Sequence, residues 1–116
     1  MNQAKKVDKD WGYEIWMANN KEEDYCGKIL HINANSSTSM HFHVKKHETF
    51  YVTKGTLCLH IMNTQTTESS PRYIEKGQTF ELSRAIPHKL EAFDDPVEII
   101  EISTFHEDSD SYRVSR

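Results

Sequence analysis

Short runs in which apolar and polar residues alternate recur along most of this chain, with turn residues between them. Residues 57–62 place Leu57, Leu59 and Ile61 on one side of an extended chain and Cys58, His60 and Met62 on the other. This period of two is typical of a half-buried strand. Similar extended runs occupy residues 13–16, 27–32, 40–43, 49–53, 72–74, 79–82, 88–93 and 97–105.

The regular spacing of these runs predicts an all-β fold. Many short strands with turns between them indicate an antiparallel sandwich or a small antiparallel β-barrel. The single helix-like piece, residues 44–49, is too short to form a useful helix, and residues 63–71 have the Thr, Ser and Gln content of a loop. A length of 116 residues suits one domain, so we expect residues 1–116 to form a single domain.

Charge and hydropathy exclude several classes of function. The net charge is −4 and no basic stripe is present, which is unfavourable for binding nucleic acid or an anionic membrane. No apolar run approaches the roughly 20 residues that a membrane span requires. Residues 1–10 are charged and lack the apolar stretch of a secretory signal, so we expect a cytoplasmic protein. Cys26 and Cys58 are not spaced as a metal-binding pair and are interpreted as buried free thiols.

Three histidines and a glutamate form the most informative pattern. His41 and His43 are separated by one residue, so on a strand both imidazoles project from the same face. Glu48 can return to that face after a local bend, and His88 begins a later strand. Three imidazoles and one carboxylate suit one divalent transition metal, either manganese, zinc, iron, nickel or cobalt, with room left for a substrate.

The same residues resemble a known family. His41, His43, Glu48 and Gly55 match the first cupin motif, HxHxxxxExxxxxxG. Gly77 and Pro87-His88 match the second motif in part, without its second glycine and closing asparagine. The resemblance implies a jelly-roll fold in which His41, His43, Glu48 and His88 bind the metal.

The resemblance extends over nearly the whole chain. It is similar to the C-terminal cupin domain of type II mannose-6-phosphate isomerases in Trp11–Glu14, Lys28, Glu48–Val52, Val97–Ile102 and Asp110–Arg113. This lineage implies a metal that polarises a sugar carbonyl and hydroxyl while a nearby base moves a proton between C1 and C2. Small cupins often pair through the edge of the first strand, so the resemblance also implies a homodimer.

Three residues are candidates for catalysis. Lys28 is charged within an apolar strand, and it either faces solvent or points into the barrel mouth, where it could bind an anionic or hydroxylated substrate; the resemblance favours the second. Glu101 interrupts the last apolar strand as either an outward solubilising group or an acid/base group. Tyr51 is an alternative proton carrier, although Phe50 and Tyr51 have opposite strand parity and only one of them can face inward.

Other polar and aromatic residues have simpler interpretations. His47 is expected at an exposed rim, whereas His31 and His60 are assigned to packing or to the surface, the latter on the same face as Cys58. Trp11 and Trp16 are expected at a strand edge or in a dimer contact. Arg84 and Arg113 could anchor a phosphate but are more simply exposed charges.

These observations support more than one function. The first hypothesis is a metal-dependent enzyme that isomerises a sugar or sugar phosphate, or a similar small polar metabolite. The second is a binding module that holds a small metabolite, such as a sugar, in the same pocket without turnover. The third is an iron-dependent dioxygenase or a lyase on the same barrel, because one fold can support several activities.

Overall fold

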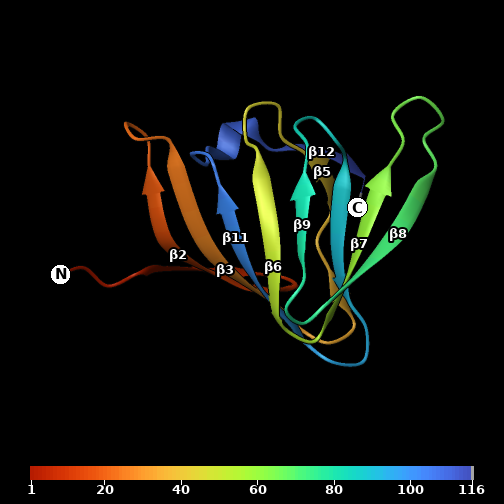
Figure 1. Cartoon of the computed structure of the whole chain (residues 1–116), viewed down its shortest axis with the longest axis horizontal. Coiled ribbons are helices and arrows are strands. Elements are labelled where there is room, and N and C mark those ends of the chain that lie inside the picture. The colour runs from red at the N-terminus through yellow and green to blue at the C-terminus, as the bar shows by residue number, and fades with distance from the viewer. Residues whose placement is uncertain (116) are drawn as a thin grey trace.

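Two antiparallel sheets make up most of the protein, and the computed structural model describes residues 1–115 (Figure 1). The first sheet has the strand order β1-β2-β3-β11-β6-β9. Its strands are β1 Lys5–Lys9, β2 Gly12–Asn20, β3 Tyr25–Ile32, β11 Val97–Ser103, β6 Glu48–Lys54 and β9 Thr79–Leu82.

The second sheet has the order β12-β5-β10-β7-β8, and β4 pairs with β10 beside this path. Its strands are β12 Tyr112–Ser115, β5 Met40–Phe42, β10 His88–Ala92, β7 Thr56–Met62, β8 Ser69–Glu75 and β4 Ser36–Ser37. A short 3-10 turn, η1 (Asp108–Asp110), precedes β12. Figure 1 shows the N-terminal end at the free side of the first sheet, beyond β2.

The hydrophobic core lies between the inner faces of the two sheets. Alternate residues of each strand point into it, as the period of two predicts. The core comprises Leu30, Ile32, Phe50, Val52, Leu57, Leu59, Ile74, Leu82, Leu90, Ala92, Val97 and Ile99. The prediction of an all-β jelly roll is confirmed, although the two sheets are not closed into a continuous barrel.

The chain termini depart from what the sequence suggested. β1 pairs with β2 along its whole length, so Trp16 on β2 does not lie on an edge strand. The C-terminal tail adds β12 to the second sheet beside β5 instead of only wrapping the surface. Both segments lie in charged stretches of the chain, β1 has a single apolar residue, and β12 alternates over only four residues, so the strand pattern is weak in both. Among the described residues, no helix has the length and apolar character that a membrane crossing requires.

Candidate functional site

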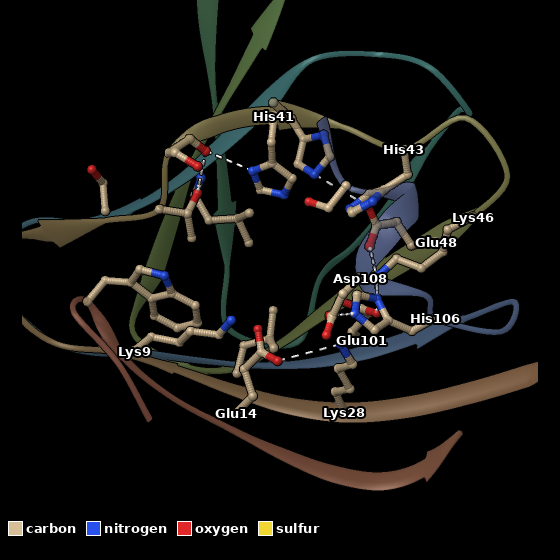
Figure 2. A pocket seen from close by; sticks show the side chains of 18 of the residues that line it. Lys9, Glu14, Lys28, His41, His43, Lys46, Glu48, Glu101, His106 and Asp108 are labelled. Carbon is tan, nitrogen blue, oxygen red and sulfur yellow. Dashed lines mark hydrogen bonds and ion pairs between the residues drawn. The ribbon is translucent and has the colours of Figure 1, made fainter. Parts of the chain in front are cut away.

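A cavity of about 620 Å³ opens between the two sheets (Figure 2). Strands β3, β6 and β11 of the first sheet and β5 and β10 of the second contribute side chains to it. The polar residues that matter most for its chemistry are Lys28, His41, His43, Lys46, Glu48, His88 and Glu101. Six of these seven, all except Lys46, were identified from the sequence as metal ligands or catalytic candidates, and the cavity brings the six together.

Three imidazoles converge on one wall of the cavity. His41 lies on β5, His43 directly follows that strand, and His88 begins β10 opposite His41 in the strand pairing. The ring centroids of His41 and His88 are 4.5 Å apart, and those of His41 and His43 are 5.2 Å apart. One ring nitrogen from each of the three lies within 4.8 Å of the others, which is close enough for a single metal ion to reach all of them.

Backbone carbonyls fix the orientation of all three rings. The Nδ1–H of His41 donates to the carbonyl oxygen of Ser39 at 2.8 Å, and that of His88 donates to Ile86 at 2.9 Å. The Nδ1–H of His43 donates to the carbonyl oxygen of Asp110 at 3.1 Å. Because a carbonyl can only accept, each Nδ1 carries the proton and each Nε2 keeps a free lone pair. This is the arrangement by which metal-binding histidines are usually held.

Burial also keeps the imidazoles neutral. It lowers the pKa of His43 to about 4, with a further contribution from the charge of Lys46. The pKa of His88 falls to about 3, mainly through burial and then through the neighbouring His41. Burial likewise lowers the pKa of His41. A neutral imidazole is the form that binds a metal, so the three residues fit a divalent ion near neutral pH.

Glu48 lies beside two of the three histidines. Its Oε2 is 3.4 Å from Nε2 of His88 and 3.7 Å from Nε2 of His43. The side chain is buried at the start of β6, on the first sheet, whereas the histidines belong to the second. Burial, and then the charge of Glu101, raises the pKa of Glu48 well above its usual range.

A buried lysine joins the two carboxylates of the cavity. Lys46 Nζ is 3.0 Å from Oε2 of Glu101 and 3.6 Å from Oε1 of Glu48 (Figure 2). The same ammonium lies 3.1 Å from Nδ1 of His106, and the Ser103 hydroxyl donates to Glu101 Oε2 at 3.2 Å. Burial opposes ionisation of Glu101, but the nearby Lys46 and Lys28 overcome it and lower the pKa of this carboxyl. Glu101 is therefore a buried, ionised carboxylate.

Lys28 also points into the cavity. Only 2% of its surface is exposed, and its Nζ lies 3.5 Å from Oε1 of Glu14 and 4.2 Å from the centre of the Trp16 ring. Trp16 Nε1 donates to the same Glu14 oxygen at 2.8 Å. Lys28 and Glu101 occupy opposed positions on β3 and β11, which places the two charges on the same inner face.

Tyr51 is not brought to the cavity. It is 37% exposed, because Phe50 takes the inward position on β6 and packs in the core. Tyr51 therefore faces away from the cavity, and the prediction that it carries a proton there is wrong. His47 lies away from the three histidines and pairs with Glu81 at 2.9 Å.

The two arginines and Trp11 have different surroundings. The guanidinium of Arg84 donates to the carbonyl of Lys45 on the protein surface. Arg113, on β12, is exposed and lines the cavity. Trp11 lines the cavity and packs against the core, so the sequence expectation of an edge position does not describe it.

Three residues of this region were not predicted from the sequence to belong to the site: Lys46, His106 and Asp110. Lys46 stands within the histidine motif, two residues before Glu48, and this position was the available signal. Asp110 accepts hydrogen bonds from the backbone amides of residues 44, 45 and 46 and so holds the loop between His43 and Glu48. Neither His106 nor Asp110 belongs to an apolar pattern, so only the folded chain brings them to the site.

The fold and the histidine cluster define a jelly-roll protein with a candidate metal site. The sequence profile described as "Cupin" matches residues 19–113, and the chain belongs to the cupin family. No curated protein matches the sequence.

Solved structures share the fold at low sequence identity. The capsular polysaccharide assembling protein CapF from Staphylococcus aureus matches with a TM-score of 0.86 and 16% identity, over 100% of this chain and 34% of that one. Oxalate decarboxylase OxdC from Bacillus subtilis matches with a TM-score of 0.82 and 14% identity, over 96% of this chain and 30% of that one. The chain thus spans about a third of these proteins.

Proposed function

We propose that this cupin is a metal-dependent enzyme that isomerises a sugar or sugar phosphate, or a closely similar small polar metabolite, in the cavity. The observation that carries the proposal is the set of three histidines whose Nδ1 atoms are all tied to backbone carbonyls. Their free Nε2 atoms share a cavity with the buried charges of Lys28 and Glu101.

His41, His43, Glu48 and His88 would hold one divalent transition metal. Imidazole and carboxylate ligands suit manganese, zinc, iron or nickel, so this donor set does not select among them. When bound, such an ion supplies Lewis-acid polarisation of substrate oxygens. The chain contributes the orientation of the ligands through its backbone carbonyls.

Glu101 is the candidate proton carrier. Isomerisation requires a base that removes a proton from one carbon and an acid that returns it to the neighbouring carbon. Lys46 and Lys28 hold Glu101 ionised, so its carboxylate can accept a proton inside the cavity. Lys28, buried and facing the same space, would bind a substrate hydroxyl or anionic group.

The substrate class rests on the sequence resemblance and on the chemistry of the cavity. The resemblance to type II mannose-6-phosphate isomerases favours a sugar phosphate, and Arg113, which lines the cavity, could contact the phosphate. CapF is named for assembling capsular polysaccharide, but at 16% identity its likeness supports the fold alone.

The metal site is tested first by plasma mass spectrometry on untagged protein purified without chelator. The variants His41→Ala and His47→Ala form a matched pair, because His47 lies outside the cluster. Wild type and His47→Ala should each retain a metal that His41→Ala loses. Equal metal content in all three proteins would contradict the proposed ligands.

Catalysis is tested with a panel of aldose and ketose phosphates and coupled detection of the product. Wild type should convert at least one of them, and Glu101→Gln should lower kcat by about 100-fold or more if Glu101 moves the proton. Unchanged kcat in Glu101→Gln would remove this residue from the mechanism, and no turnover with a metal-loaded wild type would contradict the isomerase.

A metabolite-binding cupin without turnover is the second candidate. Two observations on the candidate proton carriers favour it. Glu101 Oε2 already accepts hydrogen bonds from Lys46 and Ser103, and Tyr51 points away from the cavity. A binder would show a ligand-dependent rise in Tm without product formation. The same panel therefore separates the two functions.

A further inference from the structure

A second group of potential metal ligands lies on the other side of the second sheet. Cys58 and His60 belong to β7, and Glu91 belongs to β10. The Sγ of Cys58 is 3.4 Å from Nε2 of His60, which in turn is 2.8 Å from Oε1 of Glu91. One ligand atom from each of the three residues lies within 4.8 Å of the others. We call this group the β7–β10 cluster.

Strand geometry separates this cluster from the cavity. Cys58 and His60 are two residues apart and share a face of β7, and Glu91 is the direct partner of Cys58 on β10. The neighbouring Leu57 and Leu59 point the other way, into the core. The β7–β10 cluster is thus on the outer face of the sheet, and none of its residues lines the cavity.

We propose that Cys58, His60 and Glu91 form a second metal site, which binds zinc or a similar thiophilic divalent ion. A thiolate, an imidazole and a carboxylate are ligands that zinc commonly combines, with water in the fourth position. Tetrahedral zinc with usual bond lengths separates sulfur and nitrogen ligands by about 3.6 Å and nitrogen and oxygen ligands by about 3.4 Å. The first value is close to the observed 3.4 Å, and the second requires Glu91 to move outward from 2.8 Å by about 0.6 Å.

The surroundings allow this small movement and the access of an ion. The side chains of His60 and Glu91 are 21% and 29% exposed, so both can adjust and a water molecule can complete the coordination. Cys58 itself is buried, with Tyr73 of β8 as its direct strand partner.

The local charge favours a cation overall. Cys58 as a thiolate and Glu91 as a carboxylate supply two negative charges, and Lys89, the strand partner of His60, supplies one positive charge nearby. Burial raises the pKa of the Cys58 thiol, so metal binding must release its proton to the solvent. The charge of Glu91 also raises this pKa, whereas the Tyr73 hydroxyl and then the charge of Lys89 act in the opposite direction and favour the thiolate.

Cobalt(II) provides a direct test, because only cobalt bound to sulfur gives an intense near-ultraviolet charge-transfer absorption. Wild type titrated with cobalt should show this absorption and bind one more equivalent of metal than Cys58→Ser. Cys26→Ser is the matched control, since Cys26 is equally buried but lies on β3 in the other sheet. It should keep both the absorption and the extra equivalent.

A milder variant keeps the test valid if Cys58→Ser folds poorly. Glu91→Gln changes a partly exposed side chain and should weaken zinc binding by about tenfold or more while leaving the fold intact. Absence of the charge-transfer absorption in wild type, its survival in Cys58→Ser, or unchanged affinity in Glu91→Gln would overturn the proposal. His41→Ala should leave the absorption unchanged, so this site and the cavity site can fail independently.

Discussion

The side chain of Lys46 has an unusual position for a lysine. It is 4% exposed and lies between the carboxylates of Glu48 and Glu101. Burial lowers the pKa of a lysine, but here the two carboxylates overcome that effect and raise the pKa of Lys46. A buried ion pair is expensive to desolvate, and removing one partner leaves the others without compensation. The Lys46 ammonium therefore allows the carboxyl groups of Glu48 and Glu101 to lie close together beside the histidines.

Replacing Lys46 with methionine should destabilise the protein by about 3–5 kcal/mol, because the ionised Glu101 would then be buried without its closest cation. The measurement is guanidinium unfolding at neutral pH. Lys45→Met is the matched control, since the Lys45 side chain is 72% exposed and the change should stay within about 0.5 kcal/mol. Equal effects of the two substitutions would show that the Lys46 contacts contribute little to stability.

Single residues differed in how well the sequence predicted their position. The sequence left Lys28 and Glu101 each open between an outward and an inward position, and the structure places both on inner faces. Strand parity allowed only one inward residue between Phe50 and Tyr51, and Phe50 takes that position. Lys46 follows His43 in a loop, where no periodicity applies. Its burial depends on the fold of that loop, which the sequence alone did not reveal.

The turn between β6 and β7 shows why the first histidine motif ends in glycine. Gly55 has φ +76, and a Cβ built there would lie 2.4 Å from the carbonyl oxygen of Pro96. Gly77 also has a positive φ of +88, but a Cβ there meets nothing within 4 Å. The two glycines share the left-handed conformation and differ in the space around it.

Gly77→Ala should therefore cost about 1–2 kcal/mol, which is the price of the left-handed conformation for a residue with a Cβ. Gly55→Ala should cost more than this, because the backbone at Pro96 must also shift. Urea unfolding of both variants measures the difference. If the two alanine variants were equally stable, the close approach to Pro96 would have no energetic consequence.

The C-terminal tail anchors the loop that carries the metal ligands. The Asp110 carboxylate accepts hydrogen bonds from the backbone amides of residues 44, 45 and 46 at 3.0 Å each. Asp110→Ala would leave one buried and two partly buried amides without this partner and should destabilise the protein by about 2–3 kcal/mol. Asp94→Ala, in an exposed turn, should have little effect. Thermal unfolding of metal-free protein compares the two, and similar losses would contradict an anchoring role.

The Asp110 contribution should depend on pH. Burial alone would raise the pKa of Asp110, but the three amides stabilise the carboxylate and lower the pKa overall. A carboxyl whose folded-state pKa is lowered stabilises the fold above its unfolded-state pKa of about 3.9, and this contribution is lost as the pH falls. The stability difference between wild type and Asp110→Ala should thus shrink below about pH 4. A difference that stays constant from pH 7 to pH 3 would exclude a role for the ionised form.

The sequence predicted some strands and not others, and the difference has a physical reason. Strands with one buried face, such as β3, β7 and β11, carry the alternation that burial imposes, and the sequence predicted them. β1 is almost entirely exposed and shows no alternation. β12 alternates over only four residues, and its apolar side chains, Tyr112 and Val114, are exposed. These two strands pair through their backbones with β2 and β5, and such pairing leaves only a weak signal in the sequence.

At the scale of the whole molecule, the candidate metal ligands come from both sheets. His41, His43 and His88 belong to the second sheet and its loop, and Glu48 begins β6 of the first sheet. A metal held by all four would link the sheets at the cavity, in addition to the core that already joins them. Unfolding separates these ligands, so metal binding and global stability should be coupled.

We therefore expect a divalent metal to raise Tm, and we expect Glu48→Gln to reduce that rise. A free metal concentration about 100-fold above Kd adds about 2.7 kcal/mol to the free energy of unfolding, and a tenfold weaker Kd lowers this by about 1.4 kcal/mol. The comparison uses a Cys58→Ser background, so that the β7–β10 cluster does not contribute. Glu98→Gln, partly exposed on β11, is the control and should keep the full metal-dependent shift. Equal shifts in Glu48→Gln and Glu98→Gln would mean that the three histidines bind the metal without the first sheet.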